Sequence, residues 1–179
     1  PKLMKLFLHI TFFFFQYLFL SFSSLAKEAW VLDTDLSTIN FEMPVLLAKN
    51  VKGEFKNIQG LVEIDLNIKK NNKAIFSVDI KSVDMNYKKY RSLLLSNIFF
   101  DEQQFPKALI DTRKFAYQNE SIINLNVELT IKGITNSVPL KLEIIKLAEK
   151  LVQIKGQLKF SRTTFQIGTG SWENTSVLR

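Results

Sequence analysis

Apolar and polar residues alternate along most of the chain after Trp30. In residues 61–68, LVEIDLNI, every second residue from Val62 onward is aliphatic and the residues between are polar. Residues 74–82, 122–131, 137–145 and 152–160 repeat this period, and 37–43, 51–57 and 107–117 are compatible with it. A period of two is typical of strands with one buried face. The pattern therefore predicts about eight strands.

One-faced strands joined by short turns favour antiparallel pairing. The polar runs 69–73 and 132–136 are the clearest predicted turns, and Pro139, on an outward face, indicates an edge or a bulge. A single sheet of this length tends to curl, and closure removes its exposed edges. We expect an all-β protein, an antiparallel barrel wide enough to be filled by its own side chains or to hold one slender ligand.

Residues 87–98, YKKYRSLLLSNI, break the alternation. Their apolar positions recur at helical spacing, and a short polar turn and Phe105-Pro106 lead into the next strand. Asp84 or Asn86 is positioned to cap this helix. We expect a short helix and turn over an open barrel end, with Phe99 and Phe100 plugging or gating the bore.

The N-terminus carries a different signal. Residues 6–22 are almost wholly apolar, follow Lys2 and Lys5, and lead to Ser24-Leu25-Ala26. A basic start, an apolar run and small residues before a cut describe a secretory signal peptide. We expect residues 1–26 to be cleaved and residues 27–179 to form one periplasmic or secreted domain. An uncleaved membrane anchor is the alternative.

The net charge excludes few classes of binding partner. The chain has a net charge of +7, which falls to +5 without Lys2 and Lys5. The lysines are scattered rather than gathered into a basic stripe with aromatics, so nothing predicts a nucleic-acid partner. A weak contact with an anionic membrane surface stays possible, and the oligomeric state is open.

The missing residue types limit the chemistry more strongly. The chain has no Cys, and its single His, His9, lies in the predicted signal segment. Disulfides, thiol nucleophiles, Ser-His-Asp triads and His- or Cys-based metal sites are thereby excluded from the domain. The carboxylate pairs Asp33/Asp35 and Asp101/Glu102 fall in predicted turns, where acids serve as caps. We expect no catalytic residues, no metal and no cofactor.

Five segments carry a resemblance to a known family. In order they are WVLDTDLSTINFEM, VKGEF, YRSLLLSNIFFDEQQFP, LTIKGITNSVPL and SRTTFQIG. Together they resemble the YceI-like family of exported lipid-binding domains, over the whole of residues 27–179. The resemblance implies a lipocalin-like barrel with a helical segment across one end, a long isoprenoid or similar lipid in the bore, and no catalytic centre.

The chain departs from that family at several positions. Members usually carry His where Leu36, Val45 and Leu94 stand, and Asp where Ser92 stands. A polar head-group role for these positions is therefore not expected. Members also continue into a closing strand beyond the end of this sequence, so we expect the C-terminal strand to be truncated.

Candidate site residues follow from the inward faces and the matched motifs. Arg91 and Arg162 match family positions beside aromatic clusters. They are candidates for a bidentate clamp on a phosphate or carbonyl head group of the lipid. The alternative is that each forms a structural salt bridge or hydrogen bond. The lipid-contacting candidates are Phe41, Phe55, Phe76, Val78, Leu94, Phe99, Phe100, Leu125, Val127, Leu140, Phe165 and Trp172.

Two functions from different classes fit these observations. The first is non-enzymatic binding of a long apolar lipid, a polyisoprenoid or quinone-like molecule, for transport, storage or sequestration. The second is a barrel filled by its own side chains that acts as a protein-interaction or stress-response module. An enzyme that uses only arginine and carboxylates is a distant third.

Overall fold

The computed structural model describes residues 28–43, 51–65 and 67–174. The predicted signal segment and Val45 lie outside these residues. The strands are β1 (Glu28–Val31), β2 (Ile39–Met43), β3 (Val51–Phe55), β4 (Ile58–Ile64), β5 (Asn72–Asp79), β6 (Val83–Met85), β7 (Lys107–Phe115), β8 (Ile122–Ile131), β9 (Ile134–Ala148) and β10 (Leu151–Leu158). The helices are α2 (Lys88–Leu95) and the short 3-10 turns η1 (Ile80–Ser82), η2 (Arg162–Phe165) and η3 (Gly170–Trp172).

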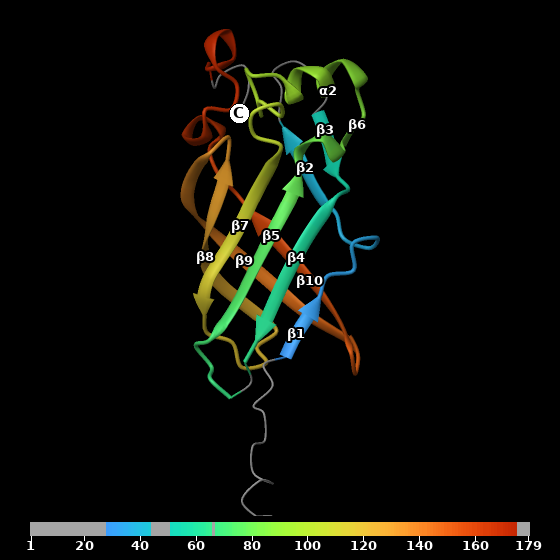
Figure 1. Cartoon of the computed structure of the whole chain (residues 1–179), viewed down its shortest axis with the longest axis vertical. Coiled ribbons are helices and arrows are strands. Elements are labelled where there is room, and N and C mark those ends of the chain that lie inside the picture. The colour runs from blue at the N-terminus through green and yellow to red at the C-terminus, as the bar shows by residue number, and fades with distance from the viewer. Residues whose placement is uncertain (1–27, 44–50, 66, 175–179) are drawn as a thin grey trace, which may run out of the picture.

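The strands form two antiparallel sheets. The larger has the order β1-β4-β5-β7-β8-β9-β10, and the smaller has the order β2-β3-β6. Figure 1 shows the larger sheet curled into a half-barrel, with β9 and β10 crossing behind β4, β5 and β7. The predicted all-β antiparallel fold is confirmed. The described strands exceed the expected eight because β1 and β6 are too short to show an alternating pattern.

The β4 strand ends earlier than its sequence pattern predicts. The alternation runs to Ile68, but β4 stops at Ile64. Asp65 Oδ1 accepts hydrogen bonds from the backbone N–H groups of Asn67 and Ile68 at 3.1 and 2.9 Å. This local side-chain turn captures the backbone before it can pair. The prediction of strand up to residue 68 was therefore wrong.

The β9 strand is longer than predicted and contains Pro139. It pairs with β8 on one side and β10 on the other, so it is not an edge strand of the sheet. The β10 pairing ends at Leu158↔Leu140, one residue before Pro139. Pro139 therefore lies where the neighbouring ladder has stopped, which is a local edge where a missing N–H is tolerated.

The helix covers the upper end of the half-barrel, as predicted (Figure 1). It spans Lys88–Leu95, and Tyr87 precedes it without a side-chain capping bond. The predicted caps are engaged elsewhere: Asp84 accepts from the Lys56 ammonium at 2.7 Å, and Asn86 Oδ1 accepts from the backbone N–H of Lys52 at 3.3 Å. The expectation of a cap from Asp84 or Asn86 was wrong, because both serve the β3–β6 region.

Two apolar clusters form the core. The upper cluster joins the half-barrel, the small sheet, α2 and η2, and its centre includes Phe55, Ile80, Leu94, Phe99 and Phe165. The lower cluster is smaller and contains Val62, Ile64, Ala74, Tyr117 and Ile123. The upper end thus contains the larger packed core, and we call it the plugged end.

Candidate functional site: the apolar inner face

The inner face of β8, β9 and β10 is built from rows of directly paired residues. Leu140 is opposite Leu125 on one side and Leu158 on the other. Below this row, Leu142 is opposite Ile123 and Gly156, and Ile144 is opposite Ile154. Because side chains alternate between the faces of a strand, all of these positions point inward. The inner face therefore carries no charged residue in these three rows.

This inner face is not uniformly covered. Val127 and Phe165, towards the plugged end, are 0% exposed, whereas Ile154 on β10 is 39% exposed. Some inward positions of the lower half, such as Ile123, are buried in the lower cluster, whereas others packed against it are only half-buried. We call the accessible set the open trough: Phe76, Leu125, Leu142, Ile144, Val152 and Ile154.

A glycine shapes one wall of the open trough. Gly60 on β4 is paired directly with Phe76 on β5. A Cβ on Gly60 would lie 2.4 Å from Cδ1 of Phe76, so the ring lies over the place where a side chain would stand. The missing side chain allows the aromatic ring to lie along the wall instead of filling the interior.

The predicted lipid-contacting residues divide between the two halves. Among those half-buried, Phe76 and Leu125 line the open trough, and Phe41, Phe100 and Trp172 pack against the upper cluster. The remaining candidates are buried in packed core: Phe55, Val78, Leu94, Phe99, Val127, Leu140 and Phe165. The structure does not bring all the candidates into one accessible surface.

Phe99 and Phe100 act as parts of the plug. The Phe99 ring meets Trp172 edge-on at 5.7 Å between centroids, and Phe100 meets Phe55 at 6.1 Å. Phe99 is 2% exposed. Their predicted position over one end is confirmed, and the packing makes them core residues there.

Arg91 is tied to the backbone next to its helix. Its Nε donates to the Val83 carbonyl at 2.9 Å, and Nη2 donates to the Lys81 carbonyl at 2.8 Å. These bonds fasten α2 to η1 and β6. The contacts are those of the structural alternative, a hydrogen-bonding arginine.

Arg162 is buried and holds the C-terminal loop. Nη1 donates to the carbonyls of Ile167 and Gly168 at 2.9 and 3.2 Å, and Nη2 donates to the Trp172 carbonyl at 2.6 Å. Burial lowers the pKa of this guanidinium, and the charge of Glu173 opposes that shift. The donors that a head-group clamp would use are directed at the protein's own backbone.

Buried polar groups in the lower half serve the sheet itself. The β5–β7 pairing is irregular between Lys73 and Ile75. There the Thr112 hydroxyl accepts from the Ala74 N–H at 2.8 Å and lies 3.2 Å from the Ala74 carbonyl. Asn72, 0% exposed, donates to the carbonyls of Lys69 and Phe115 at 2.6 and 3.2 Å. Among the described residues, no buried side-chain nitrogen or oxygen lacks a partner.

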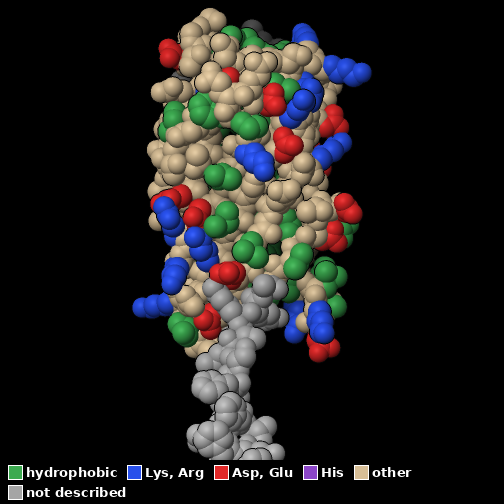
Figure 2. All heavy atoms as spheres, viewed as in Figure 1, with side chains coloured by type: hydrophobic (Ala, Val, Ile, Leu, Met, Phe, Trp, Pro, Cys, Tyr) green, Lys and Arg blue, Asp and Glu red, His purple; other side chains and the backbone are tan. Residues whose placement is uncertain are grey.

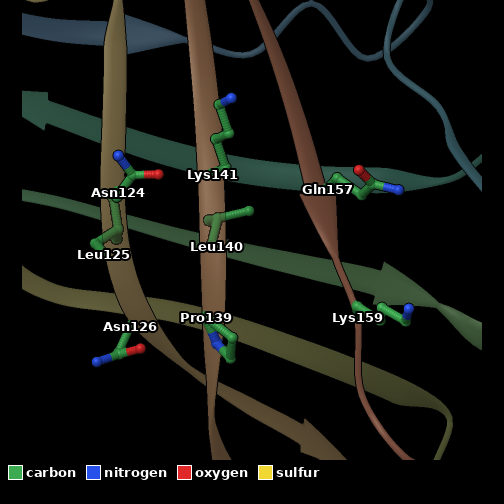
Figure 3. Close-up of a pocket in the computed structure, with 8 residues that line it drawn as sticks. All are labelled: Asn124, Leu125, Asn126, Pro139, Leu140, Lys141, Gln157 and Lys159. Carbon is green, nitrogen blue, oxygen red and sulfur yellow. The ribbon is translucent and has the colours of Figure 1, made fainter.

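A separate hollow of about 560 Å³ lies on β8, β9 and β10 (Figure 3). Besides Leu125 and Leu140, its lining is Asn124, Asn126, Pro139, Lys141, Gln157 and Lys159. These six are exposed and alternate with the inward residues, so the hollow belongs to the outer face. Its amides and lysines do not suit an apolar chain.

The described residues contain no group of three or more His, Cys, Asp or Glu side chains arranged to hold a metal ion. The same residues include no helix with the length and apolarity needed to cross a membrane.

Four trough residues, Leu142, Ile144, Val152 and Ile154, were not among the predicted contacts. Their signal was present, because all four lie on the inward side of alternating segments. The alternation could not show that the last two strands are the less covered ones.

A curled antiparallel sheet with an apolar inner face and a helix over one end defines a lipocalin-like half-barrel. The model of the YceI-like domain matches residues 30–178, and the chain belongs to this family.

The curated relatives and solved structures agree with that assignment. A UPF0312 protein of Vibrio vulnificus (strain YJ016) is 25% identical over 118 residues, which are 65% of this chain and 62% of that relative. BcnA of Burkholderia cenocepacia has a TM-score of 0.68 at 23% identity, over 79% of this chain and 88% of its own. A polyisoprenoid binding domain from Saccharophagus degradans has a TM-score of 0.64 at 12% identity, over 79% and 82%. At these identities the structures establish the shared fold.

Proposed function

We propose that this chain is an exported, non-catalytic protein that holds a long apolar lipid, such as a polyisoprenoid or a quinone-like molecule, in its half-barrel. The observation that carries this proposal is the open trough, an inward apolar surface that the described residues leave partly uncovered. The Saccharophagus degradans domain of the same fold is described as polyisoprenoid-binding, which supports this ligand class. Transport, storage or sequestration would all use such a site.

The energetics favour a ligand with many carbons and few polar groups. Burying each CH₂ contributes about 0.8 kcal/mol, so each isoprene unit adds roughly 3–4 kcal/mol before the cost of ordering the chain. The trough offers aliphatic and aromatic side chains and no charged residue in its central rows. Affinity would therefore grow with chain length rather than depend on a head group.

The absence of catalysis is part of the same proposal. Arg91 and Arg162, the cations that an enzyme lacking His and Cys would need, donate to backbone carbonyls. Asp33 Oδ1 accepts from the N–H groups of Asp35 and Leu36, the arrangement of a turn. These contacts support binding rather than turnover.

The test combines lipid extraction with a matched pair of variants. The mature protein, purified without detergent from its native host, should release stoichiometric lipid on extraction, identified by mass spectrometry. After delipidation it should bind a long-chain prenyl alcohol. Ile154→Glu places a charge in the trough and should abolish this binding, whereas Gln153→Glu, one residue away on the outer face, should leave it unchanged.

The alternative function makes the opposite prediction. A barrel filled by its own side chains, as the plugged end is, would release no stoichiometric lipid and bind no added prenyl lipid. Equal binding by the two variants would likewise contradict a site in the trough.

A further inference from the structure

The lower end of the half-barrel is constructed differently from the plugged end. It consists of the turns between β4 and β5, β7 and β8, and β9 and β10 (Figure 1). The pairing of β8 with β9 ends at Ile122↔Glu143, but β9 continues to Ala148 and pairs there with β10. The β9–β10 hairpin therefore projects beyond its neighbour on the β8 side.

Exposed aliphatic side chains gather on these projecting parts. Leu147 and Leu151, on either side of the hairpin turn, are 56% and 50% exposed, and Ile68 in the β4–β5 turn is 58% exposed. Turns of soluble domains usually carry polar residues at such tips. We call the two tips together, residues 68–70 and 146–151, the open rim.

Lysines accompany the aliphatic residues of the open rim. Lys146 and Lys150 flank Leu147 in the hairpin, which also carries the single acid Glu149, and Lys69 and Lys70 follow Ile68. The Lys69 ammonium is 3.8 Å from Glu120, but the side chains of Lys70, Lys146 and Lys150 form no ion pair or hydrogen bond with any described residue. Figure 2 shows cationic, acidic and apolar side chains close together at this end.

Two cations of the sheet wall, by contrast, are paired with acids. Lys73 and Arg113 both lie within 4 Å of Asp111, at 3.6 and 3.8 Å, and Arg113 also pairs with Glu128. Lys73 and Arg113 are thus paired with acids, whereas Lys70, Lys146 and Lys150 at the rim are left for an external anion. Aliphatic tips beside unpaired lysines match the interface of a bilayer, where acyl chains lie beneath anionic head groups.

The open trough lies at the same end of the molecule. Ile144, Val152 and Ile154 belong to the projecting hairpin, and Glu28, where the described fold begins, is paired with Ile64 at this end.

We propose that the open rim docks on the surface of an anionic lipid bilayer. Leu147, Leu151 and Ile68 insert below the head groups while Lys70, Lys146 and Lys150 pair with lipid phosphates. The plugged end points away from the membrane. Passage of a lipid from the bilayer into the trough rests on the proposed function, whereas docking itself does not.

Flotation with vesicles of phosphatidylcholine, with or without phosphatidylglycerol, tests this orientation on the mature chain. The protein should bind the phosphatidylglycerol vesicles, and Lys146→Gln with Lys150→Gln should weaken that binding by about tenfold or more at low salt. Leu147→Ser with Leu151→Ser should weaken it as well. Lys88→Gln with Lys89→Gln, at the plugged end, removes the same charge and should change nothing.

A second control separates insertion from general surface apolarity. Leu61→Ser with Leu109→Ser removes exposed leucines of the outer wall, 51% and 41% exposed, and should leave vesicle binding intact. Equal losses in the rim and control variants would overturn the proposal. The proposal would also be overturned if the unaltered chain formed a stable dimer and the Leu147→Ser/Leu151→Ser variant did not. The rim would then bind a second copy of the chain.

Titration with a detergent-solubilised prenyl alcohol separates docking from lipid binding. The rim variants should bind this lipid like the unaltered chain. Lipid binding without vesicle binding would refute docking and leave the proposed function standing. Vesicle binding without lipid binding would support the dock and refute the proposed function.

Discussion

The plugged end and the open trough share the same strands, yet they differ in how their inner faces are covered. At the plugged end, segments far apart in the sequence meet. The backbone N–H groups of Gly168 and Thr169 donate to the Ile98 carbonyl at 2.8 and 3.2 Å, and Lys132 Nζ donates to the carbonyls of Asn97 and Gln166. In the lower half, the contacts between distant segments are fewer: Tyr117 from the β7–β8 connection packs edge-on against Trp30, and its N–H donates to the Lys69 carbonyl at 3.0 Å. One half of the sheet is therefore organised for stability and the other for access.

This difference assigns different consequences to similar substitutions. A side chain removed from the plugged end leaves a cavity that fixed neighbours cannot fill. A side chain removed from the open trough changes a surface that is already partly accessible. The first change should appear in unfolding measurements and the second in lipid binding.

The largest effect is expected for Phe165→Ala. Phe165 is 0% exposed and meets Phe160 edge-on at 5.1 Å between centroids. Truncation should lower the free energy of unfolding by about 3–5 kcal/mol. Urea denaturation measures it. Phe160→Ala, which removes the 41% exposed partner, is the control and should cost much less. Similar costs would mean that the plugged end is not tightly packed.

The next largest effect is expected for Arg162→Met. The substitution keeps an unbranched side chain but leaves the carbonyls of Ile167, Gly168 and Trp172 without their donor. Loss of bonds from a charged donor in a buried site should cost about 3 kcal/mol. Thermal unfolding of the delipidated protein measures it. A variant with full stability but lost lipid binding would instead restore Arg162 as a head-group clamp.

The sequence predicted the fold because its alternation is local. In β8, the period of two continues from Ile123 to Ile131, and the structure pairs it accordingly. The sequence-based prediction failed at the end of β4, where Asp65 turns the backbone after Ile64. It also failed at the start of α2, because Asp84 and Asn86 form hydrogen bonds with residues distant in the sequence instead of capping the helix. Competing side-chain bonds of this kind are not visible in a hydrophobic pattern.

The candidate site was only partly predictable for a related reason. Alternation shows which residues face inward but not which inward residues another segment covers. Leu94 and Leu125 have the same side chain and both face the interior, yet only Leu94 is fully covered. The coverage depends on where α2 and the C-terminal loop lie in space.

A smaller effect is expected for Leu125→Ala, with Leu94→Ala as its matched comparison. Leu94 is 4% exposed, so its truncation should lower the free energy of unfolding by about 3 kcal/mol. Truncation of the half-buried Leu125 should lower it by only about 1–2 kcal/mol. Prenyl-lipid affinity should show the reverse order, since only Leu125 lines the trough. Parallel urea and lipid titrations measure both. If Leu94→Ala reduced affinity more, the helix would act as a gate to the bore.

The smallest effect is expected for Lys56→Gln, which tests whether surface ion pairs near the plugged end contribute to its stability. The Lys56 ammonium, 2.7 Å from Asp84, holds the pKa of that carboxyl below its ordinary value of 3.8. A carboxyl with a lowered pKa in the folded state stabilises the fold above the pKa of the unfolded state, and this stability is lost as the pH falls through the folded pKa. Lys56→Gln should therefore flatten the acid limb of a stability–pH profile slightly, measured as the urea midpoint between neutral and acidic pH. Because both side chains are exposed, the change should be far below that of Phe165→Ala. A large change would show that charge, rather than packing, maintains the plugged end.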